Sequence, residues 1–338
     1  MAEEPVVRPQ RGPAATGGYR EPVRCELCGS RARPLYEGLP DRLCGTPGAW
    51  RLVRCRSRRC GLVYLDPMPD RDALAEAYDD YYTHEEDRRA PDETHRPPRA
   101  WLHRASMAWL RATGLLADRR SLRLSYLDAV RPGRVLEVGC GSGWRLAELR
   151  ELGWEVVGQE VDEPAAAAAR RAHGLEVLVG PLAQLGLPAA SFDAVVSNHV
   201  LEHVLDPEPF LRECWRLVAG GGRLVCVTPN PAGFGRRVFG RYWFGLDPPR
   251  HLRMFPPRAL GAIAARSGIA ISRVWTSAAN TFVFATRSLD PPDAALRSGR
   301  AVSVLGIRLL GAALQHLAVA VHAAHRSSGD ECVLWALK

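Results

Sequence analysis

The chain has 338 residues, of which 46% are hydrophobic and 24% are charged, the balance of a globular protein that can bury a core. This length fits one main domain with a small satellite. The formal net charge is +8, but Lys338 is the single lysine among 45 basic residues, so the arginine excess indicates codon bias of a GC-rich genome. We therefore discount charge as evidence for a polyanionic partner, and no nucleic acid is expected.

Residues 1–20 are rich in proline, glycine and arginine, and we interpret them as a disordered tail. They lack the apolar run of a secretory signal, so we expect a cytoplasmic protein. The nine cysteines of the chain then lie in a reducing compartment, where paired cysteines more often bind a metal than form disulfides.

Residues 21–66 combine short strand-like pieces with two cysteine pairs, Cys25-x-x-Cys28 and Cys55-x-x-x-x-Cys60. Four thiolates in this arrangement can hold one tetrahedral zinc ion, and a site closed by four protein ligands is structural. We therefore predict a zinc-binding module. Ordinary reduced cysteines are the alternative.

Residues 67–131 contain an acidic and aromatic stretch, a proline-rich gap and an amphipathic helical stretch, and we predict connector or lid helices there. From residue 132 to 338, strands alternate with helices, which predicts an α/β fold with a doubly wound, mostly parallel sheet. The predicted strands are 135–138, 155–158, 176–179, 194–197, 224–228, 270–275 and 331–336. The predicted helices of this part are 144–152, 164–173, 209–217 and 257–267.

The first predicted strand ends in a glycine-rich loop, residues 139–143. Glycines there let a ligand approach the backbone at the carboxyl end of the strand, where such sheets bind their ligands. The preceding Glu137 would repel a pyrophosphate but suits a cofactor with a cationic group. Glu160 follows the second strand, at the position from which an acid binds the ribose hydroxyls of a nucleoside. A plain glycine turn and a solvated surface glutamate are the alternatives.

These segments, with 191–203 and 216–230, resemble class I S-adenosylmethionine-dependent methyltransferases, and 197–203 is similar to the UbiG-like small-molecule branch. The resemblance implies a seven-stranded sheet whose last strand is antiparallel. It also implies that the glycine loop contacts the methionine part of the cofactor and that the segment after the third strand contacts adenine. The cofactor-binding residues expected on this basis are Glu137, Gly139, Cys140, Gly141, Gly143, Glu160, Pro181, Leu182 and Asn198.

Methyl transfer from a sulfonium is an in-line displacement, so the protein aligns the acceptor and, for an oxygen acceptor, removes a proton. Glu202 and His203 follow the fourth strand, at the rim where the methyl group should point, and His251 lies in a loop that resembles an acceptor-side loop of this branch. A histidine suits proton removal near neutral pH. We predict these three residues as catalytic, and a purely structural role for His203 stays open.

Two further expectations concern the same region. In the UbiG-like branch a Glu-x-x-Glu-His pattern implies a divalent metal, and here the first position is His199, which argues against a hard-oxygen metal site. Arg250 and Arg253 lie beside His251, and we expect them to bind a carboxylate or phosphate of the acceptor.

An apolar helical insertion, about residues 290–327, precedes the last strand. Arg308, Gln315 and His322 recur in it every seven residues, and the region falls short of a membrane span. We expect the helix to cover protein core or to face a second copy in a homodimer. Peripheral membrane contact ranks below these, because few basic residues line the helix.

The sequence therefore predicts an S-adenosylmethionine-dependent O-methyltransferase with a structural zinc ion and a small-molecule acceptor: a sugar, a secondary metabolite, or a quinone-like or lipid-linked compound. N-terminal modules of this kind resemble those of enzymes associated with cell-surface sugars and secondary metabolites. One alternative is an RNA methyltransferase whose zinc module recognises the substrate, although the chain lacks an Asn-Pro-Pro-Tyr type of signature. Another is a cofactor-binding subunit without turnover.

Overall fold

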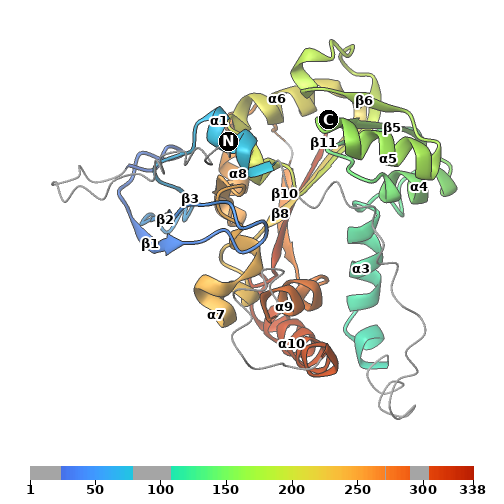
Figure 1. Ribbon diagram of the computed structural model, residues 1–338. Coiled ribbons are helices and arrows are strands. Elements are labelled where there is room, and N and C mark those ends of the chain that lie inside the picture. The colour runs from blue at the N-terminus through green and yellow to red at the C-terminus, as the bar shows by residue number, and fades with distance from the viewer. Residues whose placement is uncertain (1–23, 79–107, 271, 290–303) are drawn as a thin grey trace, which may run out of the picture.

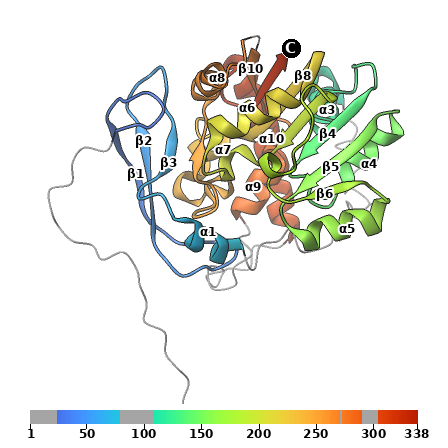
Figure 2. The same cartoon turned by 90° about the horizontal axis from the view of Figure 1, so that it is seen from above.

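Figure 1 shows a computed structural model of the chain, which describes residues 24–78, 108–270, 272–289 and 304–338. These residues form a large twisted sheet with helices packed on it and a smaller sheet at its side (Figure 2). The tail predicted at residues 1–20 and the proline-rich gap of the predicted connector lie outside the described residues.

The large sheet has seven strands in the order β10-β11-β8-β7-β4-β5-β6. Its strands are β4 (Arg134–Val138), β5 (Glu155–Glu160), β6 (Val177–Val179), β7 (Phe192–Asn198), β8 (Val218–Pro229), β10 (Ser272–Ser277) and β11 (Glu331–Leu337). The strands from β8 to β6 run parallel, and β11 is antiparallel to both of its neighbours. The predicted α/β class, the seven strands and the antiparallel last strand are confirmed.

The parallel strands are nearly continuous apolar runs because both of their faces are buried. Successive side chains point to opposite faces, so Val135 and Leu136, both fully buried, belong to different cores. One core includes the apolar faces of α6 (Pro207–Leu217) and α8 (Pro257–Arg266), and the other includes that of α3 (Leu115–Arg123). Each fully buried leucine or valine stabilises the fold by roughly 1.5–3 kcal/mol, so these layers hold the sheet together.

Two further helices, α4 (Trp144–Glu151) and α5 (Glu163–His173), pack against β5 and β6. Helix α5 begins where the Asp162 side chain accepts a hydrogen bond from the Ala165 N–H at 3.0 Å, and it ends at Gly174 in a left-handed conformation. Small alanines on its buried face allow it to lie close to the strands.

The small sheet contains β1 (Ala32–Leu39), β2 (Trp50–Cys55), β3 (Val63–Leu65) and β9 (Arg253–Met254), paired antiparallel in that order. Strand β9 lies far downstream, between predicted methyltransferase elements. The sheet therefore crosses the module boundary predicted at residue 66 and joins the cysteine module to the large domain.

Several elements were not predicted. They are α7 (Phe234–Phe239), α9 (Thr281–Leu289) and the 3-10 turns η2 (Leu182–Gln184), η3 (Leu201–His203), η4 (Gly240–Tyr242) and η5 (Phe244–Leu246). Helix α1 (Arg71–Tyr78) lies within the predicted connector of residues 67–131. Helix α9 begins with β-branched and aromatic residues, which favour strands, and its packing against α10 (Val304–Ala324) overrides that preference. Helix α10 falls within the predicted helical insertion.

Candidate functional site

The glycine loop joins β4 to α4, and its glycines have positive φ angles of 68° at Gly139, 52° at Gly141 and 77° at Gly143. A Cβ on Gly139 would lie 2.5 Å from Cγ2 of Val200, so the packing there admits no side chain. Around Gly141 no heavy atom would lie within 4 Å of such a Cβ. The loop thus leaves open space where a cofactor can approach the backbone.

Glu137 is a fully buried carboxylate in β4. Its Oε1 forms an ion pair with Arg145 of α4, whereas its Oε2 is buried without a hydrogen-bond partner. Burial raises the pKa of Glu137, and the charge of Arg145 opposes that rise. An unpaired buried carboxylate oxygen is costly, so a cationic ligand group such as the amine of S-adenosylmethionine fits this position.

Glu160, at the end of β5, is 8% exposed. Its Oε2 accepts the Gly141 N–H at 2.8 Å and its Oε1 accepts the Val161 N–H at 2.8 Å, so this carboxylate fixes the glycine loop against β5. Its Oε1 also accepts the Asp162 N–H at 3.2 Å. A carboxylate has about four lone-pair sites, so about one remains for a ribose hydroxyl. The neighbouring Gln159 was not predicted. Its Oε1 accepts the Gly139 N–H at 3.2 Å, which holds the other end of the loop.

The other predicted cofactor residues lie along the same edge of the sheet. Asn198 ends β7 beside β4, and its Nδ2 donates to Ser125 Oγ at 2.9 Å. Cys140 is buried, and its Sγ would lie 2.8 Å from a Cβ on Gly158, so this thiol packs against β5. Pro181 is exposed and Leu182 buried in the turn after β6. The cofactor-binding roles of these four residues stay predictions.

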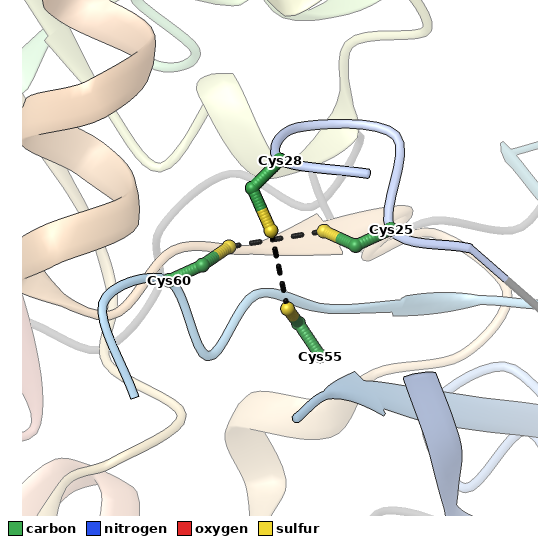
Figure 3. Close-up of side chains that lie close together, drawn as sticks. All are labelled: Cys25, Cys28, Cys55 and Cys60. Atoms are coloured by element: carbon green, nitrogen blue, oxygen red, sulfur yellow. Dashed lines mark hydrogen bonds between the residues drawn. The ribbon is translucent and has the colours of Figure 1, made fainter. Parts of the chain in front are cut away.

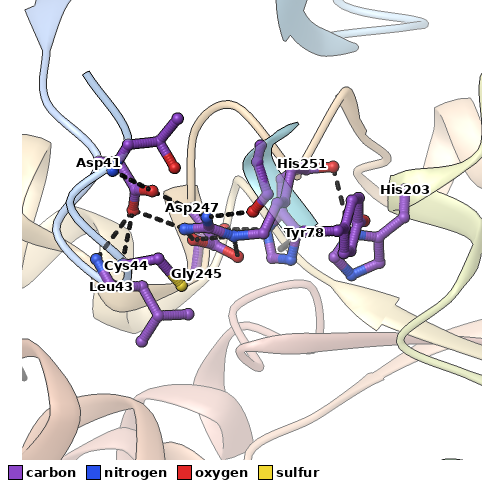
Figure 4. A network of polar contacts seen from close by, with 11 residues as sticks. Asp41, Leu43, Cys44, Tyr78, His203, Gly245, Asp247 and His251 are labelled. Carbon is purple, nitrogen blue, oxygen red and sulfur yellow. Dashed lines mark hydrogen bonds and ion pairs between the residues drawn. The ribbon is translucent and has the colours of Figure 1, made fainter. Parts of the chain in front are cut away.

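The structure brings the two predicted catalytic histidines together (Figure 4), with ring centroids 4.7 Å apart. Nδ1 of His251 donates to the Gly245 carbonyl at 2.9 Å, which leaves the Nε2 lone pair free. Nδ1 of His203 lies 3.2 Å from the Arg250 carbonyl, which can only accept, and 2.7 Å from the Tyr78 hydroxyl. When Nδ1 donates to this carbonyl, the lone pair of His203 is on Nε2.

Burial, aided by the charge of His251, lowers the pKa of His203 to about 4. His203 is thus a neutral imidazole at neutral pH. Glu202 completes the group, because its carboxylate and the two imidazoles offer donor atoms that lie within 4.8 Å of one another. Two imidazoles and a carboxylate can handle a proton, and they are also a donor set that divalent transition metals accept.

His199 does not join that group. Its Nε2 lies 2.9 Å from Glu331 of β11 and its Nδ1 lies 3.3 Å from Glu202. Burial alone would lower the pKa of His199, but hydrogen bonds to and the charges of the two carboxylates raise it to about 10. The His199 cation in turn lowers the pKa of Glu202 to about 2 against the effect of burial. Glu331 was missed because it lies 132 residues from His199 in the sequence.

Arg250 and Arg253 are both held by ion pairs within the protein. Arg250 is fully buried, with Nη2 2.6 Å from carboxylate oxygens of both Asp41 and Asp247, and Nη1 donating to the Ala77 carbonyl at 3.2 Å. The guanidinium is thereby held by the protein itself. Arg253 likewise pairs with Glu26 and donates to the carbonyl oxygens of residues 204 and 205. The buried position of Arg250 contradicts its predicted role, whereas the role of Arg253 stays a prediction, since its ion pair with Glu26 does not exclude an acceptor contact.

The four predicted metal-binding cysteines converge in the small module (Figure 3). The Sγ atoms of Cys25 and Cys60 are 3.7 Å apart, and those of Cys28 and Cys55 are 3.4 Å apart. Tetrahedral zinc with Zn–S bonds of about 2.3 Å separates its sulfurs by about 3.8 Å, so the arrangement is close to that of a zinc site. The cluster is a candidate for structural zinc.

Comparison with known proteins agrees with this geometry. Residues 108–274 match a family described as a methyltransferase domain. A Mycobacterium tuberculosis protein named "probable S-adenosylmethionine-dependent methyltransferase" is 37% identical over 127 residues, which cover 37% of this chain and 44% of that protein. This chain carries a class I S-adenosylmethionine-dependent methyltransferase domain. That assignment supports S-adenosylmethionine as the cofactor of the glycine-loop site.

Other relatives of the methyltransferase domain carry more specific names. A ubiquinone biosynthesis O-methyltransferase of Xanthomonas oryzae is 36% identical over 141 residues, covering 38% of this chain and 59% of that protein. The chain thus spans between 44% and 59% of the length of these two curated relatives. Among solved structures, a SAM-dependent methyltransferase of Archaeoglobus fulgidus covers 70% of this chain and 100% of its own, with 18% identity and a TM-score of 0.44.

Proposed function

We propose that the protein is an O-methyltransferase in which the His203 and His251 pair takes the proton of an acceptor hydroxyl. S-adenosylmethionine supplies the methyl group as a sulfonium. The acceptor oxygen bonds to the methyl carbon as the carbon–sulfur bond breaks, S-adenosylhomocysteine leaves, and the hydroxyl proton passes to a histidine Nε2. The observation that carries this proposal is the pair of adjacent imidazoles, each with Nδ1 directed at a carbonyl.

The pKa of His203 adds detail about the acceptor. A neutral imidazole accepts a proton, but a base with a pKa of about 4 is weak, and it works best on a hydroxyl that is itself acidic. A phenol or a reduced quinone loses its proton more readily than a sugar hydroxyl. The relative named as a ubiquinone biosynthesis O-methyltransferase points in the same direction. We therefore propose a phenolic or quinone-like small molecule as the acceptor, in a cytoplasmic setting.

The test replaces each histidine by asparagine. The amide nitrogen of asparagine takes the place of Nδ1, and no atom takes the place of Nε2. His251→Asn keeps the donor to Gly245, so the loop should persist while turnover with catechol-type acceptors falls by about 10²–10⁴-fold, the usual contribution of a general base. His325→Asn, at an exposed histidine, is the control. Full turnover in both the His203→Asn and the His251→Asn variant would refute proton transfer by this pair.

We also propose that the four cysteines bind one structural zinc ion. The sulfur separations support this, and no fifth protein ligand or open position is needed. Elemental analysis of the purified chain should give one zinc per protein. Cys28→Ser should lower that ratio strongly, and Cys44→Ser, outside the cluster, should leave it at one. A wild-type chain free of zinc after expression in zinc-supplemented medium would overturn the assignment.

A further inference from the structure

Helix α10 is attached to the protein along one narrow stripe. The stripe faces α9, and its centre is Gln315, which is 4% exposed. Its Nε2 donates to the Ala278 carbonyl at 2.7 Å and its Oε1 accepts the Phe282 N–H at 2.9 Å. A Cβ on Gly311 would lie 2.7 Å from Cγ2 of Thr286, so the two helices are in close contact. These contacts fix the orientation of α10.

The remainder of α10 is exposed and apolar. By length and composition alone the helix could cross a membrane, because it has 21 residues, Val304–Ala324, and only one of them, Arg308, is charged. Whether this region spans a membrane is not decided by length and composition, so the statement that it falls short of a span stays a prediction. The helix is not core either, since 28% of its most apolar window is buried. Its exposed large residues are Val304, Leu305, Leu309, Leu310 and Leu317, with exposures between 46% and 70%.

The exposed face continues onto neighbouring elements. Trp109 is 36% exposed and its ring lies 4.7 Å from that of His316 on α10, and Val283 of α9 is 44% exposed. Of the eleven exposed positions in α10, ten are apolar. Monomeric soluble proteins rarely expose so continuous an apolar surface without a partner.

The sequence around α10 lacks acidic residues. Between Asp293 and Asp330 there is no aspartate or glutamate, whereas Arg297, Arg300, Arg308 and Arg326 lie in that interval. Of these arginines, Arg308 and Arg326 belong to the described residues, and both are exposed. An apolar face with exposed arginines, no acidic residue and an exposed tryptophan is complementary to an anionic lipid surface. It is less suited to a second copy, whose identical face would bring the same positive charges together.

Area also disfavours a dimer through α10. A helix of 21 residues is about 31 Å long, and a contact strip about 10 Å wide gives about 300 Å². A standard interface buries about 800 Å² on each partner. A bilayer needs no such matched surface, because the headgroup region accommodates single helices.

The position of α10 connects this face to the catalytic edge. Helices α9 and α10 lie between β10 and β11 in the sequence, and Ser277 at the end of β10 pairs with Glu331 at the start of β11. Glu331 is the residue that contacts His199, so the helix pair lies at the same edge of the sheet as the histidines. In Figure 1 both helices lie together at one end of the sheet.

We propose that the α10 face, comprising the five large exposed residues with Trp109 and Val283, docks the protein onto an anionic lipid bilayer. Gln315 and its partners keep the helix parallel to the protein surface, so it lies in the headgroup region and does not span the membrane. The catalytic edge then faces the layer in which an apolar acceptor dissolves. Docking goes beyond the proposed methyl transfer and does not depend on it.

The test uses the full chain and sedimentation with vesicles of phosphatidylcholine, either alone or mixed with phosphatidylglycerol. We expect binding to the mixed vesicles that weakens as salt increases. Leu309→Glu should reduce the vesicle-bound fraction at least about tenfold, since it puts a charge where the proposed docking inserts an apolar side chain into the bilayer. Val238→Glu, at a 46% exposed valine on α7, adds the same charge elsewhere and should change binding little.

S-adenosylmethionine binding by calorimetry shows that each variant is folded and separates this proposal from the enzymatic one. The docking proposal is overturned if the wild type does not bind the mixed vesicles or if the two variants bind them equally. It is also overturned if sedimentation velocity shows a dimer that only Leu309→Glu dissociates, because a second copy then covers the face.

Discussion

The ion pair of Asp41 with Arg250 connects the cysteine module to the histidine loop, and its loss should be costly. Arg250 is fully buried and Asp41 is 3% exposed. Removing one member of a buried pair usually costs about 3–5 kcal/mol, because the other charge stays buried. In Asp41→Ala, Asp247 and the Ala77 carbonyl still contact the guanidinium, so we expect the lower end, about 3 kcal/mol.

The substitution also removes the acceptor of three backbone N–H groups, which adds to the expected loss of stability. The Asp41 carboxylate accepts the backbone N–H groups of Leu43, Cys44 and Thr46 at 2.9–3.1 Å. These donors reach water more easily than Arg250 does, so each should contribute about 1 kcal/mol or less. The total expected loss for Asp41→Ala is therefore about 3–6 kcal/mol.

Urea unfolding followed by tryptophan fluorescence measures this loss, since Trp243 is buried in the core shared by the module and the large domain. Asp66→Ala is the matched control. Asp66 pairs with Arg51 in the same module, but these side chains are 24% and 21% exposed, so this variant should lose less than about 1 kcal/mol. Equal losses in the two variants would refute the buried-pair argument.

Asp41→Ala should also affect methyl transfer and the affinity for S-adenosylmethionine differently. The Arg250 carbonyl contacts His203, whereas the glycine loop is held by Glu160 and Gln159. We expect methyl transfer to fall while the affinity for S-adenosylmethionine stays within about twofold of wild type. Loss of cofactor affinity in a folded variant would show that the module supports the whole site and not the histidine side alone.

Two further predictions concern the carboxylates of the site. Glu160→Gln should weaken S-adenosylmethionine binding at least about tenfold, since the amide supplies one acceptor oxygen fewer, and calorimetry beside the exposed Glu163→Gln variant checks this. The raised pKa of His199 should stabilise the fold fully below pH 6.5, and this stabilisation should be lost as the pH rises through about 10. Urea midpoints between pH 6 and pH 10 should thus fall more for wild type than for His199→Gln, and an equal fall would show that His199 is not a cation.

Local sequence patterns predicted the large sheet well. The apolar strands and the glycine loop are short-range signals, and the limits of α5 follow from two nearby residues, Asp162 at its start and Gly174 at its end. Strand β9 could not be predicted in this way. It has two residues, and it forms because β3 offers a free edge to which Arg253 and Met254 can pair.

Only those residues of the candidate site that belong to local sequence motifs were predicted. Glu202, His203 and His251 were found from motifs, and the structure places their donor atoms together. Tyr78 and Asp41 were missed, because their contacts join residues more than 100 positions apart. The buried state of Arg250 was missed too, since a loop arginine gives no sequence signal of two acidic partners.

The pairing of β3 with β9 has a consequence for the synthesis of the chain. Val63 pairs with Met254, so 191 positions (254 − 63) must be translated before the small sheet can be completed. Until then β3 exposes an unpaired edge, which can pair with other chains while the ribosome is still at work. The N-terminal module therefore cannot form its complete sheet without the rest of the chain. A gene that encodes it alone would yield a sheet without its last strand, and grafting it onto another methyltransferase would require the Arg253–Met254 segment to be transferred as well.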